Sequence, residues 1–181
     1  MAPSSGGAHS SRWYVIQVVT GKEEAMCRLI ERLAPEGSLE ECFTPRYATE
    51  MKVRGQWVPA KKPLFPGYII AASSHVDLLA ETLRRTPEFT RLLSVGETFV
   101  PLHEEDQAWI GAFTKRGDRT VPMSTGVMEG DRVVVLDGPL VGCEAMIKSV
   151  NRHKSLAILE FEICGRRVAT KVGLGIVRRR K

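Results

Sequence analysis

The sequence predicts an α+β N-terminal domain, with helices on a mixed sheet, joined by a linker to a small all-β barrel. Three observations predict this fold class. Strand-like and helix-like hydrophobic patterns alternate over residues 12–116. Residues 117–126 (GDRTVPMSTG) have the composition of a loop and no periodicity. Beyond residue 126, short apolar runs are separated by Gly, Asn and charged turns, which is typical of a small barrel.

The first strand and the first helix follow from residues 12–33. Residues 12–19 (RWYVIQVV) are aromatic and β-branched, which predicts a buried strand. Thr20 and Glu23 have capping-box spacing ahead of a helix. Apolar residues then recur three or four positions apart as far as Leu33, which indicates one buried helical face. Pro35 and Gly37 end this helix.

A hairpin, two further strands and two helices complete the expected N-terminal domain. Residues 42–53 and 56–60 predict a hairpin that turns at Arg54 and Gly55. Residues 64–72 (LFPGYIIAA) predict a strand, and Ser74 with Asp77 a second capping box ahead of a helical face at residues 76–83. Residues 89–95 predict a strand. Residues 101–116 predict a helix whose first turn carries three acids, where the helix dipole favours them.

These elements give a division into four segments. We expect a disordered tail at residues 1–11, a domain at 12–116, a linker at 117–126 and a barrel at 127–181. The first domain is long enough to bury a core of its own, whereas the barrel is near the lower limit for independent folding.

The composition argues against several classes of protein. No apolar run approaches the ~18 residues that span a bilayer, and the N-terminus does not resemble a secretory signal, so we expect a cytoplasmic protein. The four cysteines are far apart in the sequence, and buried reduced thiols are the simplest interpretation. The scattered His and Cys residues predict no catalytic set, metal site or cofactor, so we expect a protein that is not an enzyme.

The net charge of +5 lies entirely in the C-terminal part. Residues 1–116 are neutral overall, whereas residues 145–181 carry ten basic residues against two acidic ones. A neutral body with a basic end favours a polyanionic partner. A solvated basic surface without a partner is the simpler alternative, and the composition does not distinguish RNA from DNA or lipid headgroups.

Two stretches resemble a known family. The first comprises WYV at residues 13–15 with Gln17, TGKE at 20–23, LFPGY at 64–68 and Pro101-Leu102. It resembles the N-terminal (NGN) domain of NusG-type transcription elongation factors. The second comprises GDRV at 130–133, DGP at 137–139 and Gly142, and it resembles the KOW motif of the family's SH3-like C-terminal barrel. The segments FTPRY (43–47), RGQW (54–57) and VGLGIV (172–177) favour the LoaP-like specialised paralogs.

The resemblance implies that the N-terminal domain binds RNA polymerase. In the family, an apolar groove on the sheet receives the clamp helices of the largest polymerase subunit. The matching positions in this chain are Gln17, Phe65, Pro66, Tyr68 and Ile70. Aromatic anchors that receive a helix would explain these residue types, although ordinary core residues are the simpler interpretation.

The resemblance also implies contacts with nucleic acid. Lys22, Arg84 and Arg85 match regions that lie beside the non-template DNA strand in relatives, and an ordinary exposed surface would explain them as well. We expect the barrel to bind an RNA hairpin, with His153 able to stack on an unpaired base or to be an ordinary turn residue. The candidate barrel residues are Lys148, Arg152, His153, Lys154, Arg166, Arg167, Lys171, Arg178 and Arg179. The basic C-terminal run could alternatively serve solubility alone.

The barrel departs from the family's housekeeping pattern at two positions. Cys143 and Cys164 stand where housekeeping relatives have phenylalanines that help dock a ribosomal protein or the termination factor Rho. We therefore expect a monomeric antitermination factor that is recruited to RNA polymerase by a leader RNA hairpin and suppresses pausing and termination. A general NusG-like factor that couples to the ribosome or Rho is the alternative. A third alternative is a ribosomal protein or an RNA chaperone that uses the barrel alone, and in such a protein the LFPGY domain would have no role.

Overall fold

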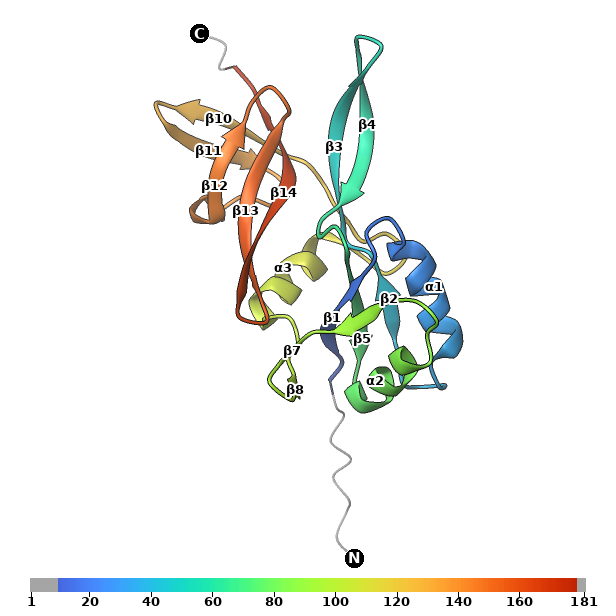
Figure 1. The fold of residues 1–181 in the computed structure, drawn as a ribbon. Coiled ribbons are helices and arrows are strands. Elements are labelled where there is room, and N and C mark those ends of the chain that lie inside the picture. Colours follow the sequence, from blue (N-terminus) through green and yellow to red (C-terminus); the bar gives the residue numbers. More distant parts are fainter. Residues whose placement is uncertain (1–9, 179–181) are drawn as a thin grey trace, which may run out of the picture.

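A computed structural model describes residues 10–178, and it confirms the expected fold class. The N-terminal part contains helices α1, α2 and α3, and Figure 1 shows the C-terminal part as a curled sheet of strands. The tail expected at residues 1–11 lies almost entirely outside the described residues.

The N-terminal part is built on a four-stranded sheet with the order β2-β5-β1-β6. All three strand pairs in this sheet are antiparallel. Its strands are β1 (Arg12–Val18), β2 (Glu41–Phe43), β5 (Tyr68–Ser73) and β6 (Thr90–Leu92). Helices α1 (Glu23–Leu33) and α2 (Val76–Arg84) pack their apolar residues against one face of the sheet. The opposite face carries Trp13, Val15 and Ile70 and belongs to a separate core cluster.

A long hairpin extends from this sheet. It consists of β3 (Arg46–Val53) and β4 (Gln56–Pro63), and it turns at Arg54 and Gly55 as the sequence predicts. Both turn residues have positive φ angles, 49° and 84°, which match the primed turns of two-residue hairpins. β3 also pairs in parallel with β9 (Thr120–Val121), so the pairing in this part of the chain is mixed.

The third helix is shorter than expected. The sequence predicts a helix over residues 101–116, but α3 spans Glu104–Phe113. Pro101 instead forms a bridge with Tyr14 of β1, which removes it from the helix. The single strand expected at residues 89–95 is divided into β6 and β7 (Ser94–Val95), and β7 pairs with β8 (Thr98–Phe99).

Neither expected capping box forms. The N-cap of α1 is Lys22, and the carboxylate of Glu23 accepts hydrogen bonds from the backbone N–H groups of Gly21 and Gly67. The N-cap of α2 is His75, whose N–H donates to the hydroxyl of Ser73 at 2.9 Å. Both predictions were wrong: Glu23 instead holds neighbouring loops in place, and no side chain caps α2 with a hydrogen bond.

The C-terminal part is a five-stranded sheet with the order β11-β10-β14-β13-β12. Its elements are β10 (Ser124–Glu129), β11 (Arg132–Asp137), the 3₁₀ turn η1 (Glu144–Met146), β12 (Ile147–Asn151), β13 (Leu156–Ile163) and β14 (Arg166–Ile176). The segment expected as a linker, residues 117–126, contains β9 and the start of β10. Strand pairing with β3 and β14 therefore orders a segment that the sequence alone does not mark as regular structure.

Among residues 10–178, no helix is long and apolar enough to cross a membrane.

Candidate functional site

The LFPGY segment forms a tight turn that leads into β5. The backbone N–H of Tyr68 donates to the carbonyl of Phe65 at 3.0 Å, with Pro66 and Gly67 between them. Gly67 has a φ of 80°, as the third residue of a type II turn requires. The buried carboxylate of Glu23 accepts a hydrogen bond from Gly67 N–H at 2.9 Å, which ties the turn to the start of α1. The turn thereby fixes the positions of Phe65 and Tyr68.

Four of the five predicted polymerase-binding residues converge on one face of the sheet. Gln17 of β1 lies directly opposite Tyr68 of β5, and Val15 lies opposite Ile70. Cross-strand partners point to the same face of a sheet, and side chains two residues apart do so as well. Phe65 and Ile70 belong to the core cluster on this face, with Tyr68 packed against it. This face is opposite to the one that α1 and α2 cover.

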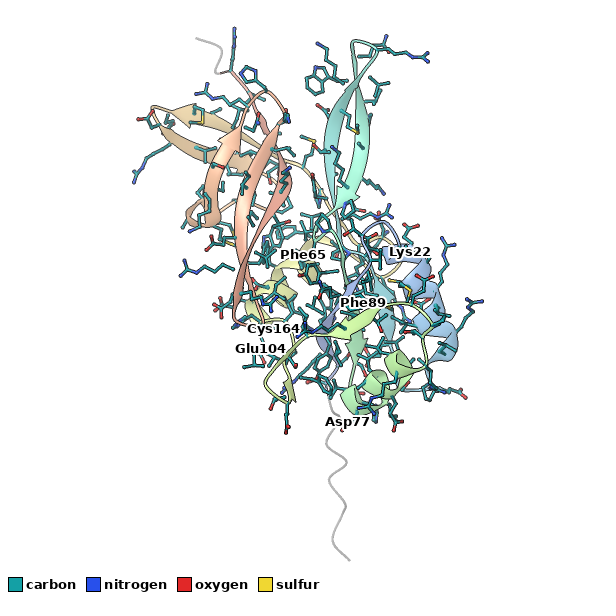
Figure 2. All side chains as sticks on the ribbon, viewed as in Figure 1. Lys22, Phe65, Asp77, Phe89, Glu104 and Cys164 are labelled. Atoms are coloured by element: carbon teal, nitrogen blue, oxygen red, sulfur yellow. The ribbon has the colours of Figure 1, made fainter. Side chains whose placement is uncertain are left out.

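The barrel packs over this face. Figure 2 shows Phe65 between the barrel and the sheet. The rings of Phe65 and Phe161 of β13 meet edge to face, with centroids 5.4 Å apart. The ring of Trp109 of α3 lies 5.8 Å from that of Phe161. Phe65 is only 1% exposed as a result, and the two parts of the chain share one hydrophobic cluster.

Polar contacts accompany the apolar ones across this interface. The hydroxyl of Thr170 donates to the carbonyl of Leu64, and the indole N–H of Trp109 donates to the carbonyl of Pro139 at 3.1 Å. The thiol of Cys164 donates to the carbonyl of Val100 at 3.6 Å. Figure 2 shows Cys164 close to Glu104, at the start of α3. These contacts fix the barrel in one orientation on the N-terminal part.

Backbone also meets backbone at the interface. A Cβ atom added to Gly173 of β14 would lie 2.3 Å from the carbonyl oxygen of Ala48 on β3. Only glycine permits such an approach. The face that carries the predicted polymerase-binding residues is therefore closed in this structure: Phe65 and Ile70 are buried, Gln17 and Tyr68 are half-buried, and Pro66 is exposed.

The predicted basic residues of the N-terminal part are all exposed. The ammonium of Lys22 forms an ion pair with Glu88 at 3.1 Å. The guanidinium of Arg85 donates to the carbonyl of Leu33 at 3.2 Å. Arg84 has no ion pair within the part of the chain that the structure describes. These residues remain candidates for contacts with phosphate.

The predicted basic residues of the barrel are also exposed, but they do not form one patch. Arg166 and Arg167 begin β14 beside the N-terminal part, whereas the turn that carries Arg152, His153 and Lys154 precedes Leu156 at the other end of β13. Seven residues at ~3.3 Å each separate these ends by about 23 Å. Lys171 lies between them, opposite Ile158. Arg178 is exposed beyond β14, and Arg179 lies outside the described residues.

An open groove lies between β11 and β12, the two edge strands of the barrel sheet. Its volume is about 820 Å³, and its basic lining residues are Arg132, Lys148 and Arg152. Glu129, Asp131 and Glu144 lie in the same groove. The mixed charges make this groove less favourable for a polyanion than the turn at residues 152–154.

The structure brings two cysteines together that are distant in the sequence. Cys27 of α1 and Cys42 of β2 are both buried, as expected, and both line a cavity of about 380 Å³. A hydrogen bond from the Cys42 thiol lowers the pKa of Cys27, and the same bond together with burial raises the pKa of Cys42. Burial also raises the pKa of Cys164. The expectation of full burial fails for Cys143 and Cys164, which are half-buried.

Within residues 10–178, no three His, Cys, Asp or Glu side chains are grouped so that they could hold a metal ion.

Sequence reasoning missed the residues that cover the sheet face. Phe161 lies in a strand whose alternating pattern marks it as buried, but that pattern does not say that its ring contacts a second domain. No feature of the sequence marked Trp109 or Thr170 as a residue that contacts the other part of the chain. Such contacts depend on how the two parts are docked, and this is not encoded in local periodicity.

Comparison with known proteins gives the family. Residues 11–110 match the family model described as "Transcription termination factor nusG". The NusG protein of Pseudomonas aeruginosa, named a transcription termination/antitermination protein, is 28% identical over 163 residues, covering 87% of this chain and 92% of its own. The protein of the same name from Campylobacter jejuni is 25% identical over 166 residues, covering 89% and 93%.

A solved structure shares the fold. The structure described as "Domain interaction in Thermotoga maritima NusG" matches with a TM-score of 0.56 and 20% identity, covering 92% of this chain and 96% of its own. The family model covers more than half of the chain, and the sequence motifs, the sheet and the barrel occur in the same order. The chain belongs to the NusG family of transcription termination and antitermination proteins.

Proposed function

We propose that this protein associates with RNA polymerase as a processive antitermination factor, and that a leader RNA hairpin recruits it. It would belong to the specialised LoaP-like branch of the family. The observation that carries the proposal is the apolar sheet face around Phe65 and Tyr68, next to a barrel that holds the net positive charge of the chain. The names of the bacterial relatives place them in transcription termination and antitermination.

The sheet face suits a helical partner. Phe65 and Tyr68 provide two large rigid rings at fixed positions beside Ile70, and Tyr68 retains a polar tip for the rim of an interface. An amphipathic helix in an apolar groove is recognised by a few such anchors. The coiled-coil clamp helices of the largest polymerase subunit are the proposed occupant.

The position of the barrel adds a condition to this proposal. Phe161 and a helix of the polymerase would compete for the ring of Phe65, so the barrel has to leave before the polymerase binds. The apparent polymerase affinity then depends on the fraction of molecules with an open face. A hairpin RNA that binds the released barrel more tightly than the docked one would raise that fraction.

Once bound, the factor would act by differential binding. Contacts that favour the closed, elongating form of the polymerase shift its population away from paused states. Lys22, Arg84 and Arg85 would add contacts to the phosphates of the non-template DNA strand. Such contacts orient the protein on the DNA but do not read its sequence. We propose that the factor acts as a monomer and needs no cofactor.

A general NusG-like role that couples transcription to the ribosome or to Rho is the second candidate, and the shared name of the relatives favours it. Cys143 and Cys164 weigh against it. Neither side chain offers the contact area of an aromatic anchor, and the thiol of Cys164 already donates a hydrogen bond to the carbonyl of Val100.

The deciding experiment is a gel shift at physiological salt. The full-length protein is titrated against a leader RNA hairpin from its own genomic neighbourhood, with a scrambled hairpin and duplex DNA as competitors. Tight binding that only the native hairpin displaces is the expected result. Weak binding that all three displace equally would contradict RNA recruitment and favour the general role.

A further inference from the structure

The tip of the β3–β4 hairpin brings three exposed apolar residues together. Figure 1 shows the hairpin extending away from the helices. Every residue from Glu50 to Trp57 is exposed. The apolar ones are Met51, Val53 and Trp57, and the indole of Trp57 is 51% exposed. A two-residue turn of the primed type joins the two strands and continues their pairing to the tip.

Trp57 has a cation beside it on the same face of the hairpin. Its cross-strand partner is Lys52, and directly paired residues project to the same side. Val53 pairs with Gln56, and this pair projects to the other side. The hairpin therefore has one face with an exposed indole next to an ammonium group, and Arg54 adds a second cation at the turn.

The charges of the hairpin favour an anionic partner. Residues 46–63 contain five basic side chains and one acidic side chain, Glu50. Arg46 is paired with Glu24, and Lys61 lies 3.6 Å from Asp118. Lys52, Arg54 and Lys62 form no ion pair within residues 10–178. Lys62 lies opposite Tyr47, toward the other end of the hairpin. The two cations nearest the indole are thus available to an external group.

The barrel places a second basic turn on the same side of the molecule. Gly173 abuts the carbonyl of Ala48 on β3, and the neighbouring N–H of Leu174 donates to the carbonyl of Ser155 at 2.9 Å. Ser155 ends the turn that carries Arg152, His153 and Lys154. In Figure 1 this turn, between β12 and β13, and the tip of the hairpin lie at the same end of the molecule.

We propose that the face formed by Lys52, Arg54 and Trp57 binds an unpaired base of a single-stranded nucleic acid. The base stacks on the indole, the two cations contact the flanking phosphates, and in the docked form the strand continues toward residues 152–154. Exposed aromatic rings beside cations are how proteins hold single strands without sequence preference. This inference deepens the proposed function and rests on it, because the strand would be the unpaired loop or flank of the recruiting RNA.

The test uses full-length protein and two twelve-nucleotide single strands, one of uridines and one of deoxythymidines. Binding is followed by the fluorescence anisotropy of a 5′-labelled strand, and stacking on the ring by quenching of tryptophan fluorescence, to which Trp57 is the most exposed contributor. Trp57→Ala should weaken binding by about 5- to 150-fold and remove most of the quenching. Trp57→Phe should retain most of the affinity. Val53→Ala, an exposed apolar residue on the other face, is the matched control and should leave binding unchanged.

The two strands distinguish the source of the ligand. Preference for uridine indicates RNA, whereas equal binding indicates a site that also accepts DNA, and both results support the inference. Binding of Trp57→Ala within twofold of wild type would overturn it. So would a loss of polymerase affinity in this variant with unchanged affinity for both strands, which would identify the tip as a protein contact.

Failure here can be separated from failure of the proposed function. Arg152→Ala with Lys154→Ala tests binding of the leader hairpin by the barrel in the gel shift. If the leader hairpin does not bind specifically while Trp57-dependent quenching persists, RNA recruitment is refuted and the single-strand site remains. If the hairpin binds and Trp57 is irrelevant to both strands, only the present inference fails.

Discussion

Phe65 and Phe161 meet edge to face across the two parts of the chain, with ring centroids 5.4 Å apart. Such a pair contributes about 0.5–1.5 kcal/mol beyond the area it buries. Thr170 and Trp109 add hydrogen bonds on either side of the pair. Phe65, which the family resemblance assigns to polymerase binding, thus contacts the barrel in this structure, and under the proposed function docking and polymerase binding would exclude each other.

Gly173→Ala should open this interface without unfolding the barrel. The new methyl group would lie 2.3 Å from the carbonyl oxygen of Ala48, and backbone cannot move aside as a side chain can. Amide hydrogen exchange in residues 64–68 should accelerate. Affinity for polymerase should rise by about tenfold or more if docking is favourable by at least ~1.4 kcal/mol.

Gly175→Ala is the matched control, because an added Cβ there meets only atoms 4.0 Å away. It should leave hydrogen exchange and polymerase affinity unchanged. If Gly173→Ala behaves like Gly175→Ala, the docked arrangement does not limit access to Phe65.

Replacing both Phe65 and Tyr68 with alanine should abolish polymerase binding and leave RNA binding intact. Each ring is a proposed anchor, and loss of an anchor typically costs about 2 kcal/mol or more, or roughly 30-fold in affinity. Binding to purified polymerase measures the effect, and circular dichroism checks that the variant is folded. Phe89→Ala removes an exposed ring elsewhere and should have no effect. Unchanged polymerase affinity in the double variant would refute the groove assignment.

The sequence was sufficient to predict those elements whose structure is determined by a local pattern of residues. Alternating and 3.6-residue patterns located β1, α1 and the β3–β4 hairpin, and the Pro66-Gly67 pair marked the turn that positions Phe65. The first capping box was wrong because the carboxylate of Glu23 accepts a hydrogen bond from Gly67, 44 residues away. The register of β9 with β3 and the contact of Phe161 with Phe65 are likewise long-range. Spacing along the chain carries no information about such contacts.

RNA affinity should fall steeply as salt rises. If about six phosphates are contacted, the affinity should decrease by roughly 10³ between 50 and 200 mM salt because bound counterions are released. Arg152→Ala with Lys154→Ala should weaken binding and reduce the slope. Arg166→Ala with Arg167→Ala separates the contribution of the other end of the barrel. A flat salt profile in the wild-type protein would exclude the basic C-terminal part as the RNA surface.

Cys27 should react as a thiolate at lower pH than Cys164. The thiol of Cys42 donates a hydrogen bond that lowers the pKa of Cys27, whereas burial raises the pKa of Cys164. Alkylation by iodoacetamide requires the thiolate, so its rate for Cys27 should reach half-maximum at lower pH than for Cys164. Mass spectrometry of the two peptides measures both rates in one sample. Cys42→Ala removes the donor and should move the Cys27 profile to higher pH, while Cys42→Ser retains a donor and should move it less. Identical Cys27 profiles in the wild-type protein and Cys42→Ala would show that this hydrogen bond does not control the thiol.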